Sequence, residues 1–263
     1  MGAAGWREKA VMKNDIPLLE YDPDPKSVLE PDHEHITMDL PERVVFAFLG
    51  DTVDDYAQGH GARIISNFVS ATKDYPLYVL NHAGEQFGLM QAPVGAPAAV
   101  QILDWLIGYG AKKVISAGSC GALEELDENV ILVPSRALRD EGTSYHYLPA
   151  SRYIEISMTA REAIEKVLKE YNLPYREVTT WSTDGFFRET PGKVTSRRRE
   201  GCSVVEMECS ALAACAQFRG IEWGEILYTG DTLSNLEAYD ERSFGRDSRT
   251  LALRLCVDAV MKL

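Results

Sequence analysis

The sequence predicts an α/β fold with a mostly parallel central sheet and helices on both of its faces. Short apolar runs that fit buried strands alternate with amphipathic segments that fit helices along most of the chain. The length of 263 residues and the hydrophobic fraction of 45% suit one large globular domain. No glycine- or proline-rich linker divides the middle of the chain, so we expect a single domain at residues 41–263.

The first 40 residues differ from the rest in composition. They are polar, rich in acidic side chains and interrupted by prolines, which is typical of irregular chain. We therefore expect residues 1–40 to form an N-terminal arm. The N-terminus lacks the apolar stretch of a signal peptide, which favours a cytoplasmic protein.

The first part of the expected domain contains three strands and a helix. Residues 44–49 form a short apolar run that ends at Gly50-Asp51, which predicts a buried strand. Apolar residues at helical spacing then predict a helix over residues 52–70. Two further strands, residues 77–80 and 86–90, flank a predicted turn.

The rest of the chain continues the alternation. Pro97 favours a helix over residues 97–109, because a missing N–H costs little in a first turn. Residues 158–171 carry apolar side chains on one face and charges on the other, which predicts an amphipathic helix. The remaining predicted elements are strands 113–117, 130–134, 175–180, 204–207 and 223–229, and helices 209–219 and 248–261.

Charge and cysteine content exclude several classes of protein. The formal net charge of −13 repels phosphate backbones and anionic lipids, so neither nucleic acid nor a membrane is an expected partner. No apolar run approaches the ~20 residues of a membrane span. We expect the one basic cluster, Arg197–Arg199, in a solvated surface turn. Five cysteines without a C-x-x-C pair favour reduced thiols over a disulfide framework or a zinc site.

Polar residues gather where four predicted strands end. In open α/β sheets, ligands bind beyond the carboxyl ends of strands, so these positions predict a binding site. Each motif alone also fits an ordinary turn. Cys120 has no obvious local base, which favours packing over a nucleophilic role. The four motifs are Gly50-Asp51, Gly118-Ser119-Cys120-Gly121, Ser182-Thr183-Asp184 and Gly230-Asp231.

The segment Glu206-Met207-Glu208 follows an apolar strand and precedes a helix. Two carboxylates two residues apart on an extended chain face the same way. One interpretation is an ordinary acidic helix start, where Glu208 benefits from the helix dipole. The other is a carboxylate that accepts both hydrogen bonds from a vicinal diol such as ribose. Composition leaves both interpretations open.

The ordered set of motifs resembles the nucleoside phosphorylase-I family, which includes uridine phosphorylases and hexameric purine nucleoside phosphorylases. The resemblance covers residues 44–263. It implies the family fold, a three-layer α/β/α sandwich whose mixed central sheet contains a distorted barrel. Its elements are Gly50-Asp51 and the segments 110–122, 139–147, 182–187, 205–211 and 229–231.

The resemblance also implies roles for individual residues. Glu208 would accept from the 2′- and 3′-hydroxyls of ribose, and Asp231 would be the general acid that protonates a purine at N7. A positioned acid of this kind is worth roughly 10²–10⁴-fold in rate. The implied ribose-binding residues are Glu208, Met207, Glu206 and His35, the last from a neighbouring subunit's arm. The implied base-binding residues are Phe186, Cys120 and Gly121, with Arg188 as a substitute for the family's usual base-binding pair. The implied phosphate-binding residues are Gly50 and Ser119, and Arg139 and Lys73 are candidates for the cations that phosphate needs.

Two positions depart from the pattern of the phosphorolytic members. Asp54 and Ser116 stand where those members place arginines that bind phosphate, and Lys73 falls near a third arginine that the partner subunit lends. Phosphate as an attacking group needs its charge compensated, which arginine does best. A phosphorylase therefore needs other cations here, whereas a nucleosidase that uses water would not.

Three hypotheses follow. The leading one is a nucleoside phosphorylase that acts on a purine or pyrimidine nucleoside, with phosphate as co-substrate and no cofactor or metal. The second is a phosphate-independent nucleoside hydrolase, and the third is a non-catalytic nucleoside-binding protein. The resemblance also implies a homo-oligomer, a dimer or a hexamer, with sites shared between subunits.

Overall fold

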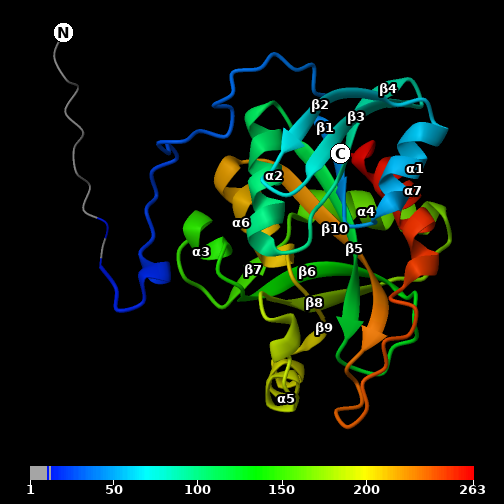
Figure 1. Cartoon of the computed structure of the whole chain (residues 1–263). Helices are drawn as coiled ribbons and strands as arrows, with labels where there is room; N and C mark the ends of the chain where they lie inside the picture. The colour runs from blue at the N-terminus through cyan, green and yellow to red at the C-terminus, as the bar shows by residue number, and fades with distance from the viewer. Residues whose placement is uncertain (1–10, 12) are drawn as a thin grey trace.

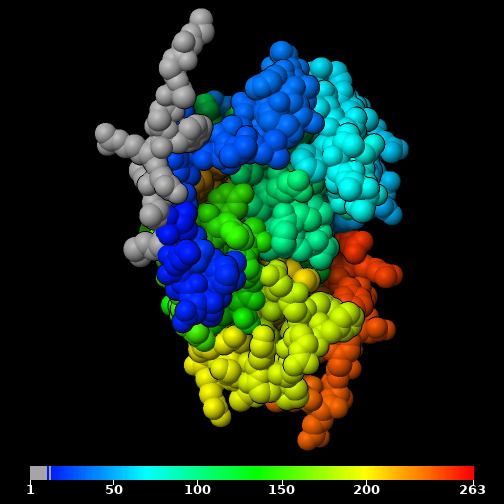
Figure 2. Space-filling view, turned by 60° about the vertical axis from the view of Figure 1, so that its left-hand side comes forward, coloured from blue at the N-terminus to red at the C-terminus, as the bar shows by residue number. Residues whose placement is uncertain are grey.

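The computed structural model describes Val11 and residues 13–263 of the chain. Within the described part of the arm, the single helical turn is η1 (Pro17–Leu19). Figures 1 and 2 show the arm as an extended segment that runs over the outside of the folded body. The irregular arm agrees with the composition of this stretch.

Ten strands form one mixed sheet in the described residues. Buried apolar side chains dominate the central strands, as expected for strands covered on both faces. The strands are β1 (Arg43–Ala47), β2 (Arg63–Val69), β3 (Asp74–His82), β4 (Glu85–Gln91), β5 (Lys113–Ala122), β6 (Ile131–Asp140), β7 (Tyr153–Glu155), β8 (Arg176–Thr183), β9 (Cys202–Glu206) and β10 (Glu222–Thr232).

Local sequence signals explain where several helices begin and end. The side chains of Ser157 and Thr190 cap the helices that follow them, and Gly220, in the left-handed conformation, ends another. The helices are α1 (Asp51–Gly59), α2 (Ala96–Gly108), α3 (Ser144–Tyr147), α4 (Met158–Glu170), α5 (Pro191–Arg199), α6 (Cys209–Arg219) and α7 (Arg249–Val260), with short 3-10 turns at η2 (Phe186–Arg188) and η3 (Arg246–Ser248).

Part of the sheet closes on itself. The strand order is β10-β6-β8-β9-β5-β1-β4-β3-β2, and an additional pairing of β10 with β5 closes a barrel of five strands. β5 therefore belongs both to the barrel and to the open sheet that continues through β1 and β4. The distorted barrel and mixed sheet confirm the predicted fold class.

Helices cover both faces of the sheet, as Figure 1 shows. One hydrophobic cluster joins α1, α4 and α7 to one face, with Val53, Ile164 and Leu253 among its buried side chains. A second cluster joins α2 and α6 to the other face, with Leu103 and Leu212 among its members. These two clusters make the three layers of the predicted α/β/α sandwich.

The predicted helix over residues 52–70 is wrong in its second half. The helix α1 ends at Gly59, and Gly61 adopts φ +66°, which favours glycine. The following segment forms β2 instead and pairs antiparallel with β3. Its β-branched and aromatic residues fit an edge strand, and the tertiary pairing overrides their apparent helical spacing.

The predicted surface turn for the arginine cluster is wrong, because the cluster lies in the last turn of α5. Arg197 forms ion pairs with Asp140 and Glu200 at 3.1 and 2.9 Å. Arg198 donates hydrogen bonds to the carbonyl oxygens of residues 123, 233 and 234. Two of the three arginines therefore bind the chain's own groups, and Arg199 is exposed as predicted.

Two further expectations concern cysteines and membranes. All five cysteines are free and buried. None of the helices in the described part of the chain is long and apolar enough to cross a membrane.

Candidate active site

The predicted motifs meet at one edge of the sheet. β1 and β5 run parallel, and β5 pairs in parallel with β10, with Ser119 opposite Tyr228. A Cβ placed on Gly121 would lie 3.2 Å from Asp231 Oδ1 and 3.1 Å from Val205. The glycine-rich motif, the candidate acid and the predicted ribose segment are therefore neighbours. Two of these motifs lie inside β5 and β10, because closing the barrel extends both strands beyond their predicted ends.

The carboxylate of Glu206 is committed to the protein's own donors. It accepts hydrogen bonds from the hydroxyls of Thr180 and Ser182, and from the backbone N–H groups of Glu208 and Cys209, at 2.6–3.1 Å. Burial raises the pKa of Glu206, whereas these donors lower it. Glu206 therefore fixes the junction of β9 and α6, so its geometry supports positioning and not direct contact with ribose.

Glu208 is the carboxylate of this segment that can still accept hydrogen bonds from a ligand. Its Oε1 accepts one hydrogen bond, at 2.5 Å, from the backbone N–H of Gly95 at the start of α2. Burial, followed by the neighbouring Glu206 carboxylate, raises the pKa of Glu208 to about 8. Met207 lies between them and is half-buried. A buried carboxylate with an open oxygen suits the hydroxyl donors of a sugar.

A cavity of about 460 Å³ has Asp231 in its wall. Asp231 lies beside Gly121, which pairs with Val205 at the start of the ribose segment. Its walls are largely apolar, which suits the flat face of a nucleobase. Phe186 is 45% exposed and lines the cavity, as expected for a side chain that stacks on a base. The lining residues used below are Phe186, Glu189, Asp231, Asn235 and Tyr239.

Asp231 lies in the wall of this cavity and is 8% exposed. Its Oδ2 accepts a hydrogen bond from the Tyr239 hydroxyl at 3.0 Å. Burial raises the pKa of Asp231, although the Tyr239 hydrogen bond lowers it. A raised pKa favours the protonated form that a general acid requires.

Cys120 and Gly121 lie behind the cavity wall, next to Asp231, and neither lines the cavity itself. The Cys120 side chain is buried and donates to the carbonyl oxygen of Tyr228 at 3.5 Å. Burial raises its pKa well above the usual value, so the thiolate is disfavoured. A Cβ on Gly121 would also meet Leu233 at 2.9 Å, so only glycine fits beside Asp231.

Ser119 and Gly50 form the predicted phosphate side of the site. Ser119 is exposed although both neighbours in β5 are buried, so its hydroxyl faces an open space. Gly50 precedes α1 with φ +59°, a conformation that favours glycine. The N–H groups of a helix start provide donors for an anion.

Arg249, the first residue of α7, reaches this loop. A Cβ placed on Gly50 would lie 3.3 Å from Arg249 Nη1. The Nε atom of Arg249 is buried, and it has no hydrogen-bond partner among the described residues. The guanidinium also contacts the Tyr228 side chain, and its positive charge beside Gly50 is what an oxyanion needs. Arg249 was not predicted from the sequence, although an arginine in a first helical turn opposes the helix dipole and was a usable signal.

The two departures from the family pattern both have hydrogen-bond partners elsewhere in the chain. The Oγ atom of Ser116 accepts a hydrogen bond from Trp223 Nε1 at 3.1 Å, and Ser116 is fully buried. The carboxylate of Asp54 accepts from the Tyr78 hydroxyl at 2.9 Å. Asp54 thus has a partner of its own.

Arg139 does not fit its predicted phosphate role. It is 4% exposed, and its guanidinium donates to Ser144 Oγ, Ser151 Oγ and the carbonyl oxygens of residues 148 and 149. It also lies over the ring of Tyr145. These bonds use the guanidinium to hold the loop around α3, so few donors remain for a ligand.

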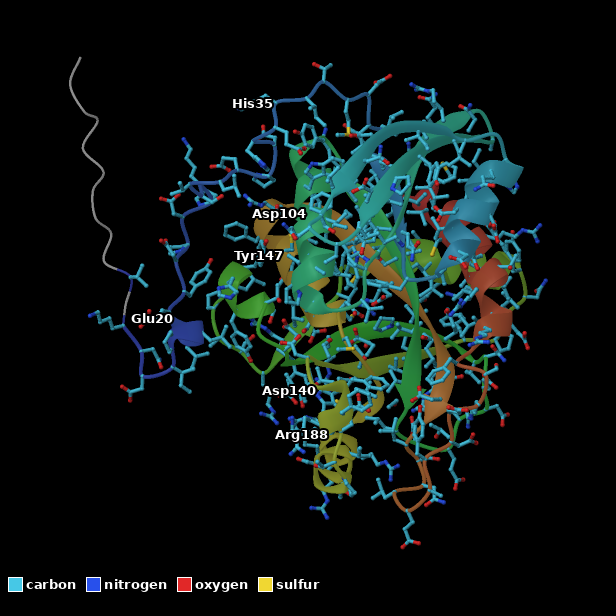
Figure 3. The ribbon with its side chains drawn as sticks, viewed as in Figure 1. Glu20, His35, Asp104, Asp140, Tyr147 and Arg188 are labelled. Carbon is cyan, nitrogen blue, oxygen red and sulfur yellow. The ribbon has the colours of Figure 1, made fainter. Side chains whose placement is uncertain are left out.

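Three other predicted residues lie apart from the site within one chain. Lys73 is exposed on the hairpin between β2 and β3. His35 is exposed on the arm, and Figure 3 shows it at the opposite end of the molecule from Arg188. Arg188 is exposed at the end of η2 and does not line the base cavity. Contributions of Lys73 and His35 across a subunit boundary stay predictions.

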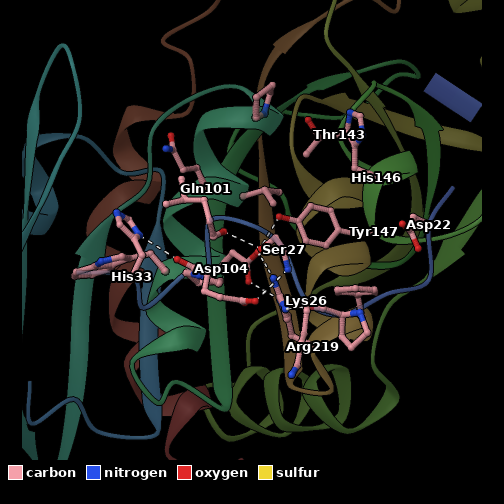
Figure 4. A pocket seen from close by; sticks show the side chains of 18 of the residues that line it. Asp22, Lys26, Ser27, His33, Gln101, Asp104, Thr143, His146, Tyr147 and Arg219 are labelled. Carbon is pink, nitrogen blue, oxygen red and sulfur yellow. Dashed lines mark hydrogen bonds and ion pairs between the residues drawn. The ribbon is translucent and has the colours of Figure 1, made fainter. Parts of the chain in front are cut away.

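A second hollow of about 650 Å³ lies between the arm and helices α2 and α3 (Figure 4). At its centre, Asp104 accepts hydrogen bonds from Arg219 at 2.7 and 2.9 Å and from the Tyr147 hydroxyl at 2.9 Å. These bonds tie α2 to α6 and α3. Both oxygens of Asp104 have partners, which indicates a structural role for this network.

Comparison with known proteins agrees with this geometry. A family model described as the phosphorylase superfamily matches residues 42–261. The chain belongs to the phosphorylase superfamily. The predicted relation to nucleoside phosphorylases is thereby confirmed at the level of the family.

Individual members of the superfamily are distant relatives. The purine nucleoside phosphorylase of Plasmodium falciparum is 23% identical over 159 residues, which cover 59% of this chain and 65% of that enzyme. The match therefore spans less than two thirds of the relative's length.

Two solved structures share the fold. The uridine phosphorylase of Vibrio fischeri superposes with a TM-score of 0.73 at 20% identity, over 86% of this chain and 94% of that one. The AMP nucleosidase of Bacteroides thetaiotaomicron gives a TM-score of 0.69 at 23% identity, over 85% and 89%.

Proposed function

We propose that the protein cleaves the N-glycosidic bond of a nucleoside with inorganic phosphate, which gives free base and ribose 1-phosphate. The observation that carries this proposal is the position of Arg249 beside Gly50. Ser119 is exposed on β5, which pairs with the neighbouring strand β1. The site then has a cation, a hydroxyl and backbone donors for phosphate. Arg249 thus takes over from the family arginines that are absent at Asp54 and Ser116.

The proposed reaction assigns one task to each side of the site. Glu208 holds the 2′- and 3′-hydroxyls of the ribose, and Phe186 stacks on the base. Asp231, protonated, gives its proton to N7 of a purine as the bond between C1′ and the base breaks. A phosphate oxygen forms the new bond to C1′, and the proton that phosphate loses restores Asp231 through solvent.

Relatives named as phosphorylases support this proposal, among them the Plasmodium falciparum enzyme that acts on purine nucleosides by its name. A nucleosidase among the structural neighbours supports the second candidate, hydrolysis by water. The absence of arginine at positions 54 and 116 also favours hydrolysis. The two reactions share Glu208 and Asp231 and differ in their need for Arg249.

The test is the phosphate dependence of base release in the wild type and in Arg249→Ala. A bidentate Arg–phosphate contact is worth several kcal/mol, so we expect the KM for phosphate to rise by about 10²-fold or more. Arg249→Lys keeps the charge without the planar fork and should lie in between. Arg254→Ala, which changes an arginine one and a half turns further along α7, is the matched control.

Each outcome discriminates between the candidates. Phosphate-dependent release that Arg249→Ala weakens supports phosphorolysis at this site. Release that is equally fast without phosphate in the wild type supports hydrolysis. Phosphate dependence that Arg249→Ala leaves unchanged contradicts the role of Arg249.

The implied oligomer belongs to the same proposal. His35 and Lys73 are both exposed and lie apart from the site of their own chain, so they contribute only if a second subunit presents them. We propose a homo-oligomer in which these residues complete the neighbouring site.

A further inference from the structure

The base cavity contains a second carboxylate that the proposed reaction does not use. Glu189 lines the same cavity as Asp231, and no lysine or arginine of the described residues lines the cavity. The other polar side chains of the lining are Thr190, Asn235 and Tyr239. The only charged groups that this described lining can present to a ligand are therefore the two carboxylates.

The Glu189 carboxyl accepts no hydrogen bond from the described residues. Its pKa is raised to about 7, first by burial and then by the charge of Asp231, with Lys193 acting in the opposite direction, and no hydrogen bond contributes. Lys193 Nζ pairs with Asp140 at 3.2 Å, outside the cavity. The Tyr239 hydroxyl donates to Asp231. Both oxygens of Glu189 therefore stay open to a ligand.

An open carboxylate recognises adjacent hydrogen-bond donors. Guanine has a ring N1–H beside its 2-amino group, which together match the two oxygens of one carboxylate. Uracil has a single N–H between two carbonyl oxygens, which a carboxylate repels. Adenine has an unprotonated ring nitrogen beside its amino group, so only one donor faces the carboxylate. Hypoxanthine keeps the N1–H but lacks the 2-amino group.

We propose that Glu189 is a specificity-determining residue that selects 2-amino-6-oxopurine bases, by accepting hydrogen bonds from N1–H and the 2-amino group. The proposal rests on the proposed function for the location of the base, but not on the nature of the nucleophile. Asp231 and Glu189 would then bind opposite edges of one purine, N7 on one side and the Watson–Crick edge on the other. Phe186 would cover its face.

The experiment compares guanosine with inosine, which differ only by the 2-amino group. We expect the wild type to prefer guanosine by about 10-fold or more in kcat/KM, the worth of one hydrogen bond to a charged group. In Glu189→Gln one acceptor is replaced by a donor, so the preference should fall to about one or reverse. Glu189→Ala should lose the preference as well. Glu237→Gln, an exposed glutamate on the following loop outside the cavity, should retain it.

Binding of the free bases separates this inference from the proposed reaction. Titration of the wild type and Glu189→Gln with guanine and hypoxanthine reports the same contact without any turnover. A preference for guanine that Glu189→Gln abolishes supports the inference even if the wild type ignores phosphate. A wild type that binds both bases equally, or a preference that survives in Glu189→Gln and Glu189→Ala, overturns it while leaving phosphorolysis intact.

The pH dependence supplies a further readout that a structural role would not produce. Since the carboxylate must be ionised to accept both hydrogen bonds, the preference for guanine should grow as the pH rises through about 7. The groups whose charge acts on Glu189 are Asp231 and Lys193. A preference that is flat between pH 6 and 8 contradicts the inference.

Discussion

Glu208→Gln tests whether the Glu208 carboxylate binds ribose, because the substitution changes the charge of the side chain and keeps its size. The glutamine keeps the shape of the side chain and an amide oxygen. That oxygen can still accept the hydrogen bond from the N–H of Gly95, which Glu208 Oε1 accepts at 2.5 Å in the wild type. In an assay above pH 8, where Glu208 is ionised, the substitution removes the negative charge of the carboxylate that would accept from both ribose hydroxyls. Hydrogen bonds to a charged group contribute about 1.5–3 kcal/mol each, so we expect a loss of about 10²–10⁴-fold in kcat/KM.

The assay compares a ribonucleoside with its 2′-deoxy analogue. The wild type should prefer the ribonucleoside by about 10-fold or more, because the analogue lacks one of the two donors. In Glu208→Gln this preference should largely disappear, whereas Glu162→Gln on the exposed face of α4 should keep it. A variant that keeps near wild-type activity and the full preference refutes the assignment of Glu208 to ribose.

The same substitution has a stability signature with a defined sign. The pKa of Glu208 is raised to about 8 in the folded protein, so the folded state binds more protons than the unfolded state at neutral pH. Stability therefore falls as the pH rises from about 4.5 towards 8. Glu208→Gln should remove this dependence and unfold at higher temperature than the wild type at pH 8.5.

Two further substitutions test the acid and the structural arginine. Asp231→Asn should lower kcat/KM for a purine nucleoside by roughly 10²–10⁴-fold. In a pH–rate profile, the wild type should lose activity as the pH rises past the pKa of Asp231, and the variant should not show this loss. An unchanged profile argues against the acid role. Arg139→Ala should lower the free energy of unfolding, measured by urea denaturation, by roughly 2–4 kcal/mol, because the loop around α3 loses hydrogen bonds. Unchanged stability together with a raised KM for phosphate would instead support a role of Arg139 in the phosphate site.

The alternation of strands and helices was predictable because it depends on local periodicity. Most predicted elements occur close to their expected positions, including α2, α4, α6 and α7. The second half of the predicted helix 52–70 was wrong because apolar residues in β2 also fit a helical spacing. Only the pairing of β2 with β3 decides between helix and strand for this segment. That pairing is a tertiary contact, so local sequence does not reveal it.

Within the site, the order of motifs predicted which strand ends meet, but it could not predict which side chains are free to bind a ligand. The structure separates Glu206, which is saturated by internal donors, from Glu208, which is not. Arg249 and Glu189 were missed because they join the site only through the fold. Arg249 comes from a helix about 200 residues after Gly50 in sequence. Arg139 was overestimated because its partners lie in an irregular loop.

The nature of the nucleophile is the central claim, and product analysis tests it most directly. The wild type is incubated with guanosine in phosphate buffer and in a phosphate-free buffer, and the sugar product is identified by phosphorus and proton NMR. We expect ribose 1-phosphate in an amount equal to the base released, and almost no release without phosphate. Free ribose formed at the same rate in both buffers would contradict this claim.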